Sequence, residues 1–223
     1  GDVDSGFTAL DFFAAVPGLG LERIDREALD FHGVTVDYGP TTQVFHIGRG
    51  AVAVPSGISG LLAAWRRGGS MPLSELVAPA IELARKGYVL GPGVRFVVDL
   101  LEPIMVRSAP VQEIFFNGPD MPVTGQRMVN PRLGDFLEQL AEEGEALIRG
   151  PYTDALLAAF GPERGGLLTR QDLERYQPVF RDPLKVFCGV SDVLTNPPPS
   201  SGGALIGLGL RVARCMELGS LEF

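Results

Sequence analysis

The sequence has few of the residues that usually carry hydrolytic, redox or metal chemistry. Its 223 residues include two histidines and two cysteines. His32 and His46 stand alone rather than at metal-ligand spacing, so we expect no metal site. Cys188 and Cys215 lack the CxxC pattern of redox or zinc sites, and we expect them to be unbridged thiols in the core.

Cofactor motifs are also missing from the chain. No GxSxG nucleophile turn, P-loop or kinase signature occurs, and the glycines after Gly202 have the wrong spacing for a dinucleotide-binding turn. We therefore expect no cofactor. The absence of these motifs excludes the common serine-hydrolase and nucleotide-dependent classes, but it leaves open enzymes that need neither histidine nor a bound group.

Basic patches and long apolar runs are absent as well. Lys and Arg number 19 against 27 Asp and Glu, a formal net charge of −8, which opposes binding to a phosphate backbone. The longest uncharged apolar stretches, 51–65 and 202–210, are broken by glycine and shorter than the roughly 18 residues of a membrane span. We expect neither a nucleic-acid partner nor a span. The first five residues lack the features of a secretory signal, and the compartment stays open.

What the chain does contain is typical of a folded protein built from short elements. It is 45% hydrophobic and 21% charged, with 29 glycines and 18 prolines spread along its length. Alternating and β-branched runs predict strands, and the 3.6-residue period predicts helices. Helices and strands alternate irregularly, so we expect a mixed α and β fold in one domain, residues 1–223.

The expected elements follow from these local patterns. We expect strands or strand-like runs at 6–13, 34–36, 43–47, 51–54, 184–187 and 190–195. We expect helices from Ser56 to Gly68, at 72–77 and 79–86 with a boundary at Pro79, from Asn130 to Gly144, at 152–160, from Thr169, and from about Gly203 to Met216. Asn130 followed by Pro131, and Thr169 three residues before Asp172, are typical helix starts.

One segment, Pro197–Gly203, stands out from the rest. Three prolines impose an extended approach, and two serines and two glycines then let the backbone turn into a helix whose first N–H groups are free. Such a turn suits an anion or a carbonyl oxygen. The simpler interpretation, which physical reasoning favours, is a rigid corner in which Ser200 or Ser201 caps the helix.

Several segments together resemble the gamma-glutamyltransferase (glutathione hydrolase) family. Its large subunit has similar motifs in the same order, and the similarity extends from about residue 8 to residue 217. The segments that carry the resemblance are Ala53–Gly60, Leu76–Gly87, Gly165–Tyr176, Arg181–Leu184 and Pro197–Gly203.

This resemblance implies a fold and a chemistry. The implied fold is α+β, a four-layer αββα sandwich of the N-terminal-nucleophile hydrolase type, of which this chain is the large-subunit part or a fragment of it. In the family a precursor cuts itself before a threonine, whose hydroxyl then attacks a gamma-glutamyl amide while its own α-amine acts as base. That threonine would lie on a small subunit from the same precursor, in a heterodimer or a higher oligomer, so we expect no catalytic residue in this chain. Family members are often exported.

One position departs from the family pattern. Where the family has an arginine that binds the glutamyl α-carboxylate, followed by a glutamate, this chain has Phe13 and Ala14. We expect both in the substrate pocket, near a structural turn formed by Ser200, Ser201, Gly202 and Gly203. Phenylalanine does not bind a carboxylate, so an acylase-like relative that cleaves another amide stays open, as does a scaffold that has lost catalysis.

Two further segments resemble motifs of the family less well. Thr41–Gln43 is similar to the start of the family's small subunit but lies too early in the chain, so we do not expect cleavage there. Arg26 and Glu27 offer an Arg-Glu pair that lacks the family's following proline, and we expect an ordinary surface pair.

Overall fold

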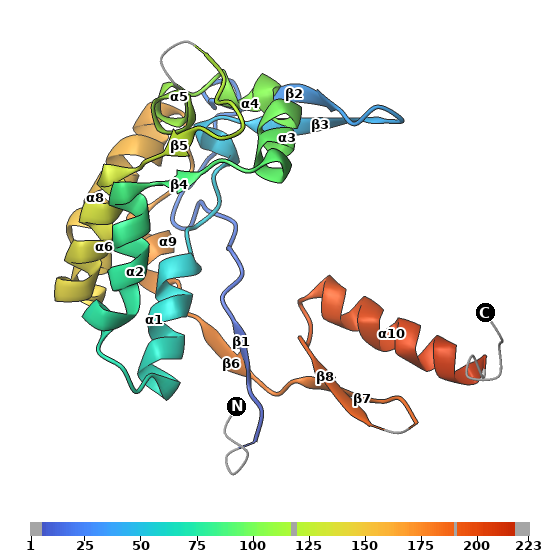
Figure 1. Ribbon diagram of the computed structural model, residues 1–223. Helices are drawn as coiled ribbons and strands as arrows, with labels where there is room; N and C mark the ends of the chain where they lie inside the picture. The colour runs from blue at the N-terminus through green and yellow to red at the C-terminus, as the bar shows by residue number, and fades with distance from the viewer. Residues whose placement is uncertain (1–5, 117–119, 190, 217–223) are drawn as a thin grey trace. The chain divides into compact units, whose positions relative to one another are not determined.

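The computed structural model describes residues 6–116, 120–189 and 191–216, and its contacts divide the chain into two compact units (Figure 1). Unit 1 combines Gly1–Phe13 with Gln177–Phe223, and unit 2 is the continuous stretch Ala14–Tyr176. The expectation of one domain, residues 1–223, stays a prediction. Every helix in the described ranges is too short or too polar to cross a membrane.

Unit 2 is mainly helical. Its α-helices and two 3-10 turns are α1 (Gly57–Gly68), α2 (Leu73–Lys86), α3 (Pro92–Leu100), α4 (Glu102–Met105), α5 (Ala109–Phe115), α6 (Pro131–Glu143), α7 (Glu145–Arg149), α8 (Pro151–Phe160), α9 (Arg170–Arg175), η1 (Arg49–Ala51) and η2 (Pro162–Arg164). The expected helices after Ser56, Asn130 and Thr169 are confirmed, as is the helix at 152–160.

The core of unit 2 lies where helices α1, α6 and α7 meet. Leu62, Leu140 and Leu147 are buried there, and the rings of Phe136 and Tyr152 pack beside them with centroids 5.2 Å apart. These are the apolar positions of the helical stripes, so hydrophobic burial brings the helices together.

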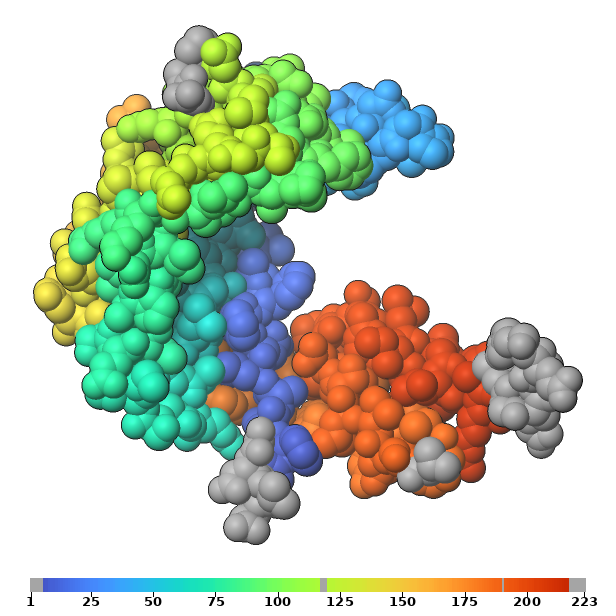
Figure 2. All heavy atoms as spheres, viewed as in Figure 1, coloured from blue at the N-terminus to red at the C-terminus, as the bar shows by residue number. Residues whose placement is uncertain are grey.

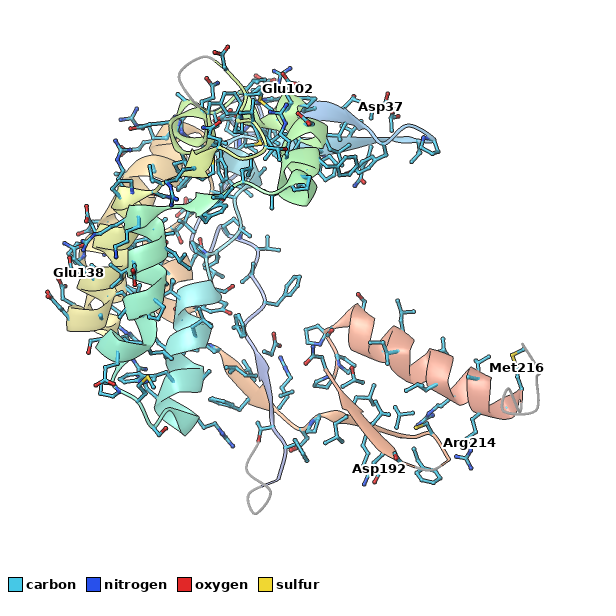
Figure 3. All side chains as sticks on the ribbon, in the orientation of Figure 1. Asp37, Glu102, Glu138, Asp192, Arg214 and Met216 are labelled. Atoms are coloured by element: carbon cyan, nitrogen blue, oxygen red, sulfur yellow. The ribbon has the colours of Figure 1, made fainter. Side chains whose placement is uncertain are left out.

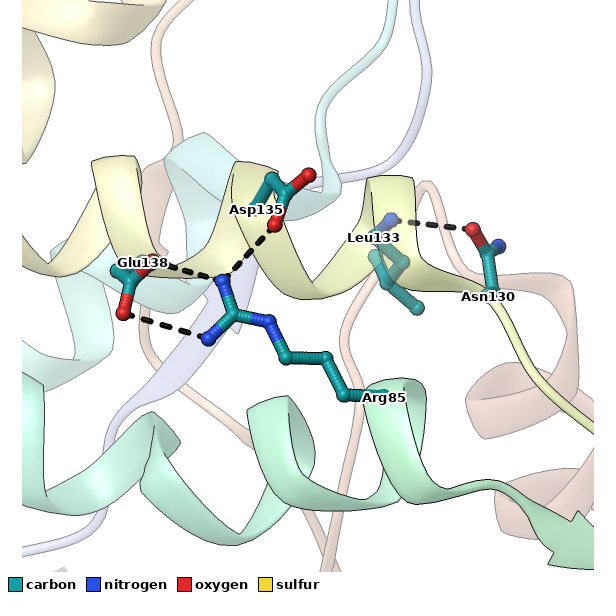
Figure 4. Close-up of polar contacts among 5 residues, drawn as sticks. All are labelled: Arg85, Asn130, Leu133, Asp135 and Glu138. Atoms are coloured by element: carbon teal, nitrogen blue, oxygen red, sulfur yellow. Dashed lines mark hydrogen bonds and ion pairs between the residues drawn. The ribbon is translucent and has the colours of Figure 1, made fainter.

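Helices α2 and α6 lie side by side along this core (Figure 4). Arg85 of α2 donates to Asp135 at 2.8 Å and to Glu138 at 2.7 Å, both on α6. At the start of α6, Asn130 Oδ1 accepts the Leu133 N–H at 3.0 Å, as its sequence position predicts. These ion pairs are exposed, so each adds little to the stability of the packed helices.

The predicted helix boundary at Pro79 is wrong. Helix α2 runs from Leu73 to Lys86 with Pro79 inside it. Proline has no N–H to donate to the carbonyl of Glu75, a loss that typically costs about 3 kcal/mol in a helix interior. Packing along α6 and the contact of Leu73 with the core outweigh this local cost, so the two predicted segments are one helix.

The strands of unit 2 form two small antiparallel pairs. Strands β2 (His32–Asp37) and β3 (Thr42–Ile47) form a hairpin, and β4 (Tyr88–Val89) pairs with β5 (Arg127–Met128). The expected strand at 51–54 is wrong in most of its length. Residue 51 belongs to η1, residues 52 and 53 are in no strand, and Val54 forms only an isolated bridge to Ala15. Glycines on both sides of Arg49 favour this tight turn over an extended strand.

Unit 1 joins the two ends of the described chain. Strand β1 (Ala9–Asp11) pairs with β6 (Val179–Arg181), and β7 (Leu184–Phe187) forms a hairpin with β8 (Asp192–Thr195). Part of the strand expected at 190–195 is thus confirmed, and residue 190 lies outside the described residues. Helix α10 (Ser201–Cys215) packs on the β7–β8 hairpin and ends where the sequence predicts.

Polar contacts also hold the hairpin of unit 1 (Figure 3). Asp192 at the start of β8 pairs with Lys185 at 2.7 Å, and the Arg214 guanidinium of α10 lies 5.3 Å from the ring centroid of Phe187. The cysteines are free, but the expectation that both lie in the core is wrong, because Cys215 is exposed on α10 and Cys188 is only partly buried beside the hairpin turn. The helical period of the sequence alone does not show that Cys215 lies on the exposed side of α10.

A buried carboxylate connects the start and the end of unit 2. Asp172 is 2% exposed and accepts the N–H groups of Gly18 at 2.8 Å, Leu19 at 3.0 Å and Thr169 at 2.9 Å. Thr169 completes the predicted capping box at the start of α9. Burial raises the pKa of Asp172, but the hydrogen bonds from Gly18, Leu19 and Thr169 outweigh it and hold the pKa below its usual range. Asp172 therefore ties two distant segments as an anion.

We expect Asp172→Asn to lower the free energy of unfolding by about 1–3 kcal/mol, because the amide has one acceptor oxygen for three backbone donors. Glu174→Gln, on the exposed side of the same helix, is the matched control and should change it by less than about 0.5 kcal/mol. Urea unfolding of the intact protein at neutral pH measures both values.

The same pair of proteins tests the ionisation of Asp172. Since its folded pKa lies below its unfolded pKa, its contribution is complete above about pH 4 and is lost as the pH falls through the folded value. The difference between wild type and Asp172→Asn should therefore shrink below about pH 4. A difference that grows on acidification would contradict a lowered pKa.

Candidate functional site

A pocket of about 550 Å³ lies within unit 1, between the N-terminal strand and the turn that precedes α10. Its volume is in the range of small-molecule sites. The residues that line it are Ala9, Leu10, Asp11, Phe12, Phe13, Asn196, Pro197, Pro199, Ser200, Ser201 and Gly202. Two segments almost 190 positions apart in the sequence thus form one wall each.

The structure brings together most of the residues that the sequence places at the site. Phe13, Ser200, Ser201 and Gly202 all line the pocket. Gly203 is buried just behind the turn, and Ala14 belongs to unit 2 and is not among the lining residues. Their roles in substrate binding stay predictions.

The turn before α10 is held by its own hydrogen bonds. The Ser200 N–H donates to the carbonyl of Pro197 at 3.1 Å, and Ser200 Oγ accepts the Gly203 N–H at 3.4 Å. Ser200 is therefore the N-cap of α10, which confirms the interpretation of this segment as a helix-capping corner. The corner also forms a pocket wall, so the two interpretations of Pro197–Gly203 are compatible.

Glycine allows a close approach at two places where α10 meets other backbone and side chains. A Cβ at position 203 would overlap the carbonyl oxygen of Asn196. A Cβ at position 207 would lie 3.2 Å from side-chain atoms of Leu184 and Val186 on β7. These close approaches set the distance between α10, the corner and the hairpin.

An ion pair fixes the other wall of the pocket. Arg181 Nε donates to Asp11 Oδ2 at 2.8 Å, and the Phe13 N–H donates to Asp11 Oδ1 at 3.1 Å. These bonds, from Phe13 first and Arg181 second, hold the pKa of Asp11 below its usual range. Asp11 thus orients the backbone at Phe13 and joins β1 to β6.

Sequence reasoning missed the pairing of Asp11 with Arg181. Arg181 begins one of the segments that carry the family resemblance, and Asp11 lies two residues before Phe13, but the two face each other diagonally across the β1–β6 pair, with Ala9 opposite Arg181. Only the register of two strands 170 positions apart reveals such a pair.

The described lining residues provide walls and donors but no complete catalytic group. No histidine, lysine or arginine is among them, and Asp11 is already engaged by Phe13 and Arg181. Neither serine therefore has a general base in the described part of the pocket. Within the described ranges no cluster of three His, Cys, Asp or Glu residues could hold a metal ion.

The remaining candidates lie in unit 2, outside this pocket. His32 Nδ1 is 3.6 Å from Asp30, and the ring of His46 stacks on Phe31 with centroids 4.8 Å apart. Thr41 and Thr42 are at the turn of the β2–β3 hairpin. These contacts are structural, and they do not assemble a second catalytic group.

Comparisons with known proteins agree on one family. A family model described as Gamma-glutamyltranspeptidase matches residues 30–222. The chain is 29% identical to the Acylase ACY 1 proenzyme of Pseudomonas sp. (strain SE83) over 99% of its length and 39% of that protein's. It is 34% identical to the human Glutathione hydrolase 5 proenzyme over 77% of its length and 30% of that protein's.

A solved structure shows the same fold. The Helicobacter pylori gamma-glutamyltranspeptidase matches with a TM-score of 0.79 and 24% identity, over 97% of this chain and 60% of that one. The match shows that this chain has the fold of that protein, and it confirms the predicted α+β fold class. Among the described residues the strands pair only two by two. The chain spans less than two fifths of the length of the two curated relatives described above.

We expect Gly203→Ala to destabilise the protein by about 1–3 kcal/mol, because its Cβ would displace the Asn196 carbonyl and the corner. Gly209→Ala in the same helix is the control: nothing lies within 4 Å of its Cβ position, and it should stabilise by about 0.5–1 kcal/mol. Thermal unfolding of both variants measures the difference. Equal effects of the two substitutions would contradict the close approach at Gly203.

Proposed function

The chain belongs to the gamma-glutamyltranspeptidase family, and we propose that it is the large-subunit part of an amide hydrolase or acyltransferase of the gamma-glutamyltransferase type. The observation that carries this proposal is the family match through residues 30–222, which includes the corner Pro197–Gly203 on the pocket wall. Relatives named glutathione hydrolase and acylase support amide cleavage as the common chemistry.

In the proposed reaction the nucleophile is the N-terminal threonine of a small subunit. Its hydroxyl oxygen attacks the amide carbonyl, its α-amine takes the hydroxyl proton and passes it to the departing amine, and the C–N bond breaks. Water or an amino acid then attacks the acyl-threonine ester and frees the threonine. Backbone N–H donors stabilise the oxyanion of each step. The lack of a base beside Ser200 and Ser201 agrees with a nucleophile outside this chain.

The residues of this chain would bind and orient the acyl group. Strand β1 and the corner form the two walls of the pocket, and Asp11 and Arg181 hold the first wall in place. Gly203 lets the second wall approach closely. Ordered walls lower the entropy cost of placing the amide beside the threonine.

A second candidate is an acylase-like enzyme that cleaves a non-glutamyl amide. The observation that favours it is Phe13, which lines the pocket at the position where the family resemblance leads one to expect an arginine. The match to an acylase proenzyme over 99% of this chain agrees with it. Both candidates use the same threonine chemistry and differ in the acyl group.

The proposed chemistry is tested on the protein purified from its source. We expect two polypeptides, one containing this chain and a second beginning with threonine, which N-terminal sequencing and intact mass identify. Incubation with an amide donor should add the acyl mass to the second polypeptide only, and replacement of its first threonine by alanine should abolish turnover. A single polypeptide without a threonine-initiated companion would instead indicate a non-catalytic scaffold.

The proposed partner also explains the exposed apolar surface of unit 1. Helix α10, red in Figure 2, packs on the corner at Gly203 and on the hairpin at Gly207, and it also exposes large apolar residues. These residues are Leu205, Ile206, Leu208 and Val212. Several large apolar residues exposed together are typical of a surface that another chain covers, so we propose that the rest of the precursor covers this part of α10.

Expressed alone, the chain should be poorly soluble, because α10 and the edges of the two-stranded sheets would face water. Co-expression with the threonine-initiated subunit should restore solubility, measured as the soluble fraction after centrifugation. Replacing Leu205 and Leu208 by glutamate should raise the solubility of the isolated chain and weaken assembly. A soluble, cooperatively unfolding monomer of the unmodified chain would contradict the partner proposal.

A further inference from the structure

The charges around the pocket of unit 1 limit what it can bind. Asp11 is the one residue with a formal charge among the described lining residues. Its carboxylate accepts bonds from the Phe13 N–H and from Arg181, which is its cationic partner. No described lining residue is therefore a cation for a bound carboxylate.

We infer that this pocket takes an uncharged, apolar acyl group, aromatic or branched aliphatic, and that Phe13 is the residue that determines this specificity. The inference rests on the proposed function, because it concerns the acyl group that the threonine would transfer. It decides between the two candidates in favour of the non-glutamyl amide.

A charged acyl group would be disfavoured in this place. A carboxylate beside the Asp11–Arg181 pair would lose water without gaining an unpaired cation as its partner. Arg181 offers little compensation, since its guanidinium already balances Asp11 at 2.8 Å. The α-carboxylate of a glutamyl group therefore finds no unpaired cation among the described lining residues.

An apolar acyl group would gain contacts instead. Phe13 is 82% exposed and Phe12 is 37% exposed, so both carry aromatic surface that a ligand would cover. Covering such surface is favourable in proportion to its area, and rings also stack on rings. The pocket volume of about 550 Å³ accommodates a phenyl ring with a short linker.

The polar groups that remain suit one uncharged oxygen. The N–H groups of Ser201 and Gly202 open the first turn of α10, and among the described residues no hydrogen-bond acceptor for them occurs. Such N–H groups are the unsatisfied donors of a helix start. The carbonyl oxygen is the acceptor that every amide donor presents, whatever its acyl group.

The test compares three donors on the processed full-length protein. Gamma-glutamyl-p-nitroanilide, phenylacetyl-p-nitroanilide and 4-methylvaleryl-p-nitroanilide share one leaving group and differ in the acyl group. We expect kcat/KM for the better neutral donor to exceed that for the glutamyl donor by about tenfold or more. Faster turnover of the glutamyl donor would overturn the inference while leaving the proposed chemistry standing.

Variants at Phe13 connect the preference to this pocket. Phe13→Arg should shift the ratio of kcat/KM toward the glutamyl donor by about tenfold or more, and Phe13→Ala should raise KM for the neutral donors with a smaller change in kcat. Val16→Arg is the matched control, because Val16 is 88% exposed and lies outside the lining residues, so the same added charge should leave the ratio unchanged.

The outcomes distinguish a failure of the inferred acyl specificity from a failure of the proposed function. If Phe13→Arg fails to fold, Phe13→Ala still tests the contact, and an unchanged KM would refute a role for Phe13. If no donor of either kind acylates the threonine of the wild-type protein, the proposed function itself fails, and the inferred specificity fails with it.

Discussion

The close approach of helix α10 to the chain around it is the constraint on which unit 1 depends. Gly203 packs against the Asn196 carbonyl and Gly207 against Leu184 and Val186, so the helix, the corner and the hairpin have almost no freedom of spacing. The pocket wall at Ser200–Gly202 is the exposed edge of this arrangement. A wall fixed by backbone contacts keeps its shape better than one built on flexible side chains.

Strong local signals account for the parts of the fold that could be predicted from the sequence. The caps at Asn130 and Thr169 are satisfied by hydrogen bonds within three residues, so they need no tertiary information. Pro79 misled the prediction because packing along α6 outweighs a local preference. Helices α3, α4 and α5 went unpredicted because they are short and begin at or near prolines, which a periodicity argument treats as breaks.

The candidate site likewise combines features that local sequence predicts with features that only tertiary structure determines. The corner Pro197–Gly203 is unusual in composition, and its helix cap follows from that short stretch, whereas its place near the pocket was implied by the family resemblance. Asp11 and Arg181 could not be paired in advance, because strand register between distant segments is set by tertiary structure. The same limit explains Ala14, which is next to Phe13 in sequence yet belongs to the other unit. Residues that are adjacent in a sequence motif therefore do not necessarily line the same pocket wall.

The joining of both chain ends in unit 1 has a consequence for synthesis on the ribosome. Unit 2 is a continuous segment, so all of it has been made once Tyr176 emerges, and domains that emerge first generally fold first. Strand β1 is translated before all of unit 2, and its partner β6 emerges only after all of unit 2. Strand β1 must therefore wait, unpaired, while the whole of unit 2 is translated, and pairings of such long range form slowly. During that interval the nascent chain exposes an unpaired strand to which a chaperone could bind.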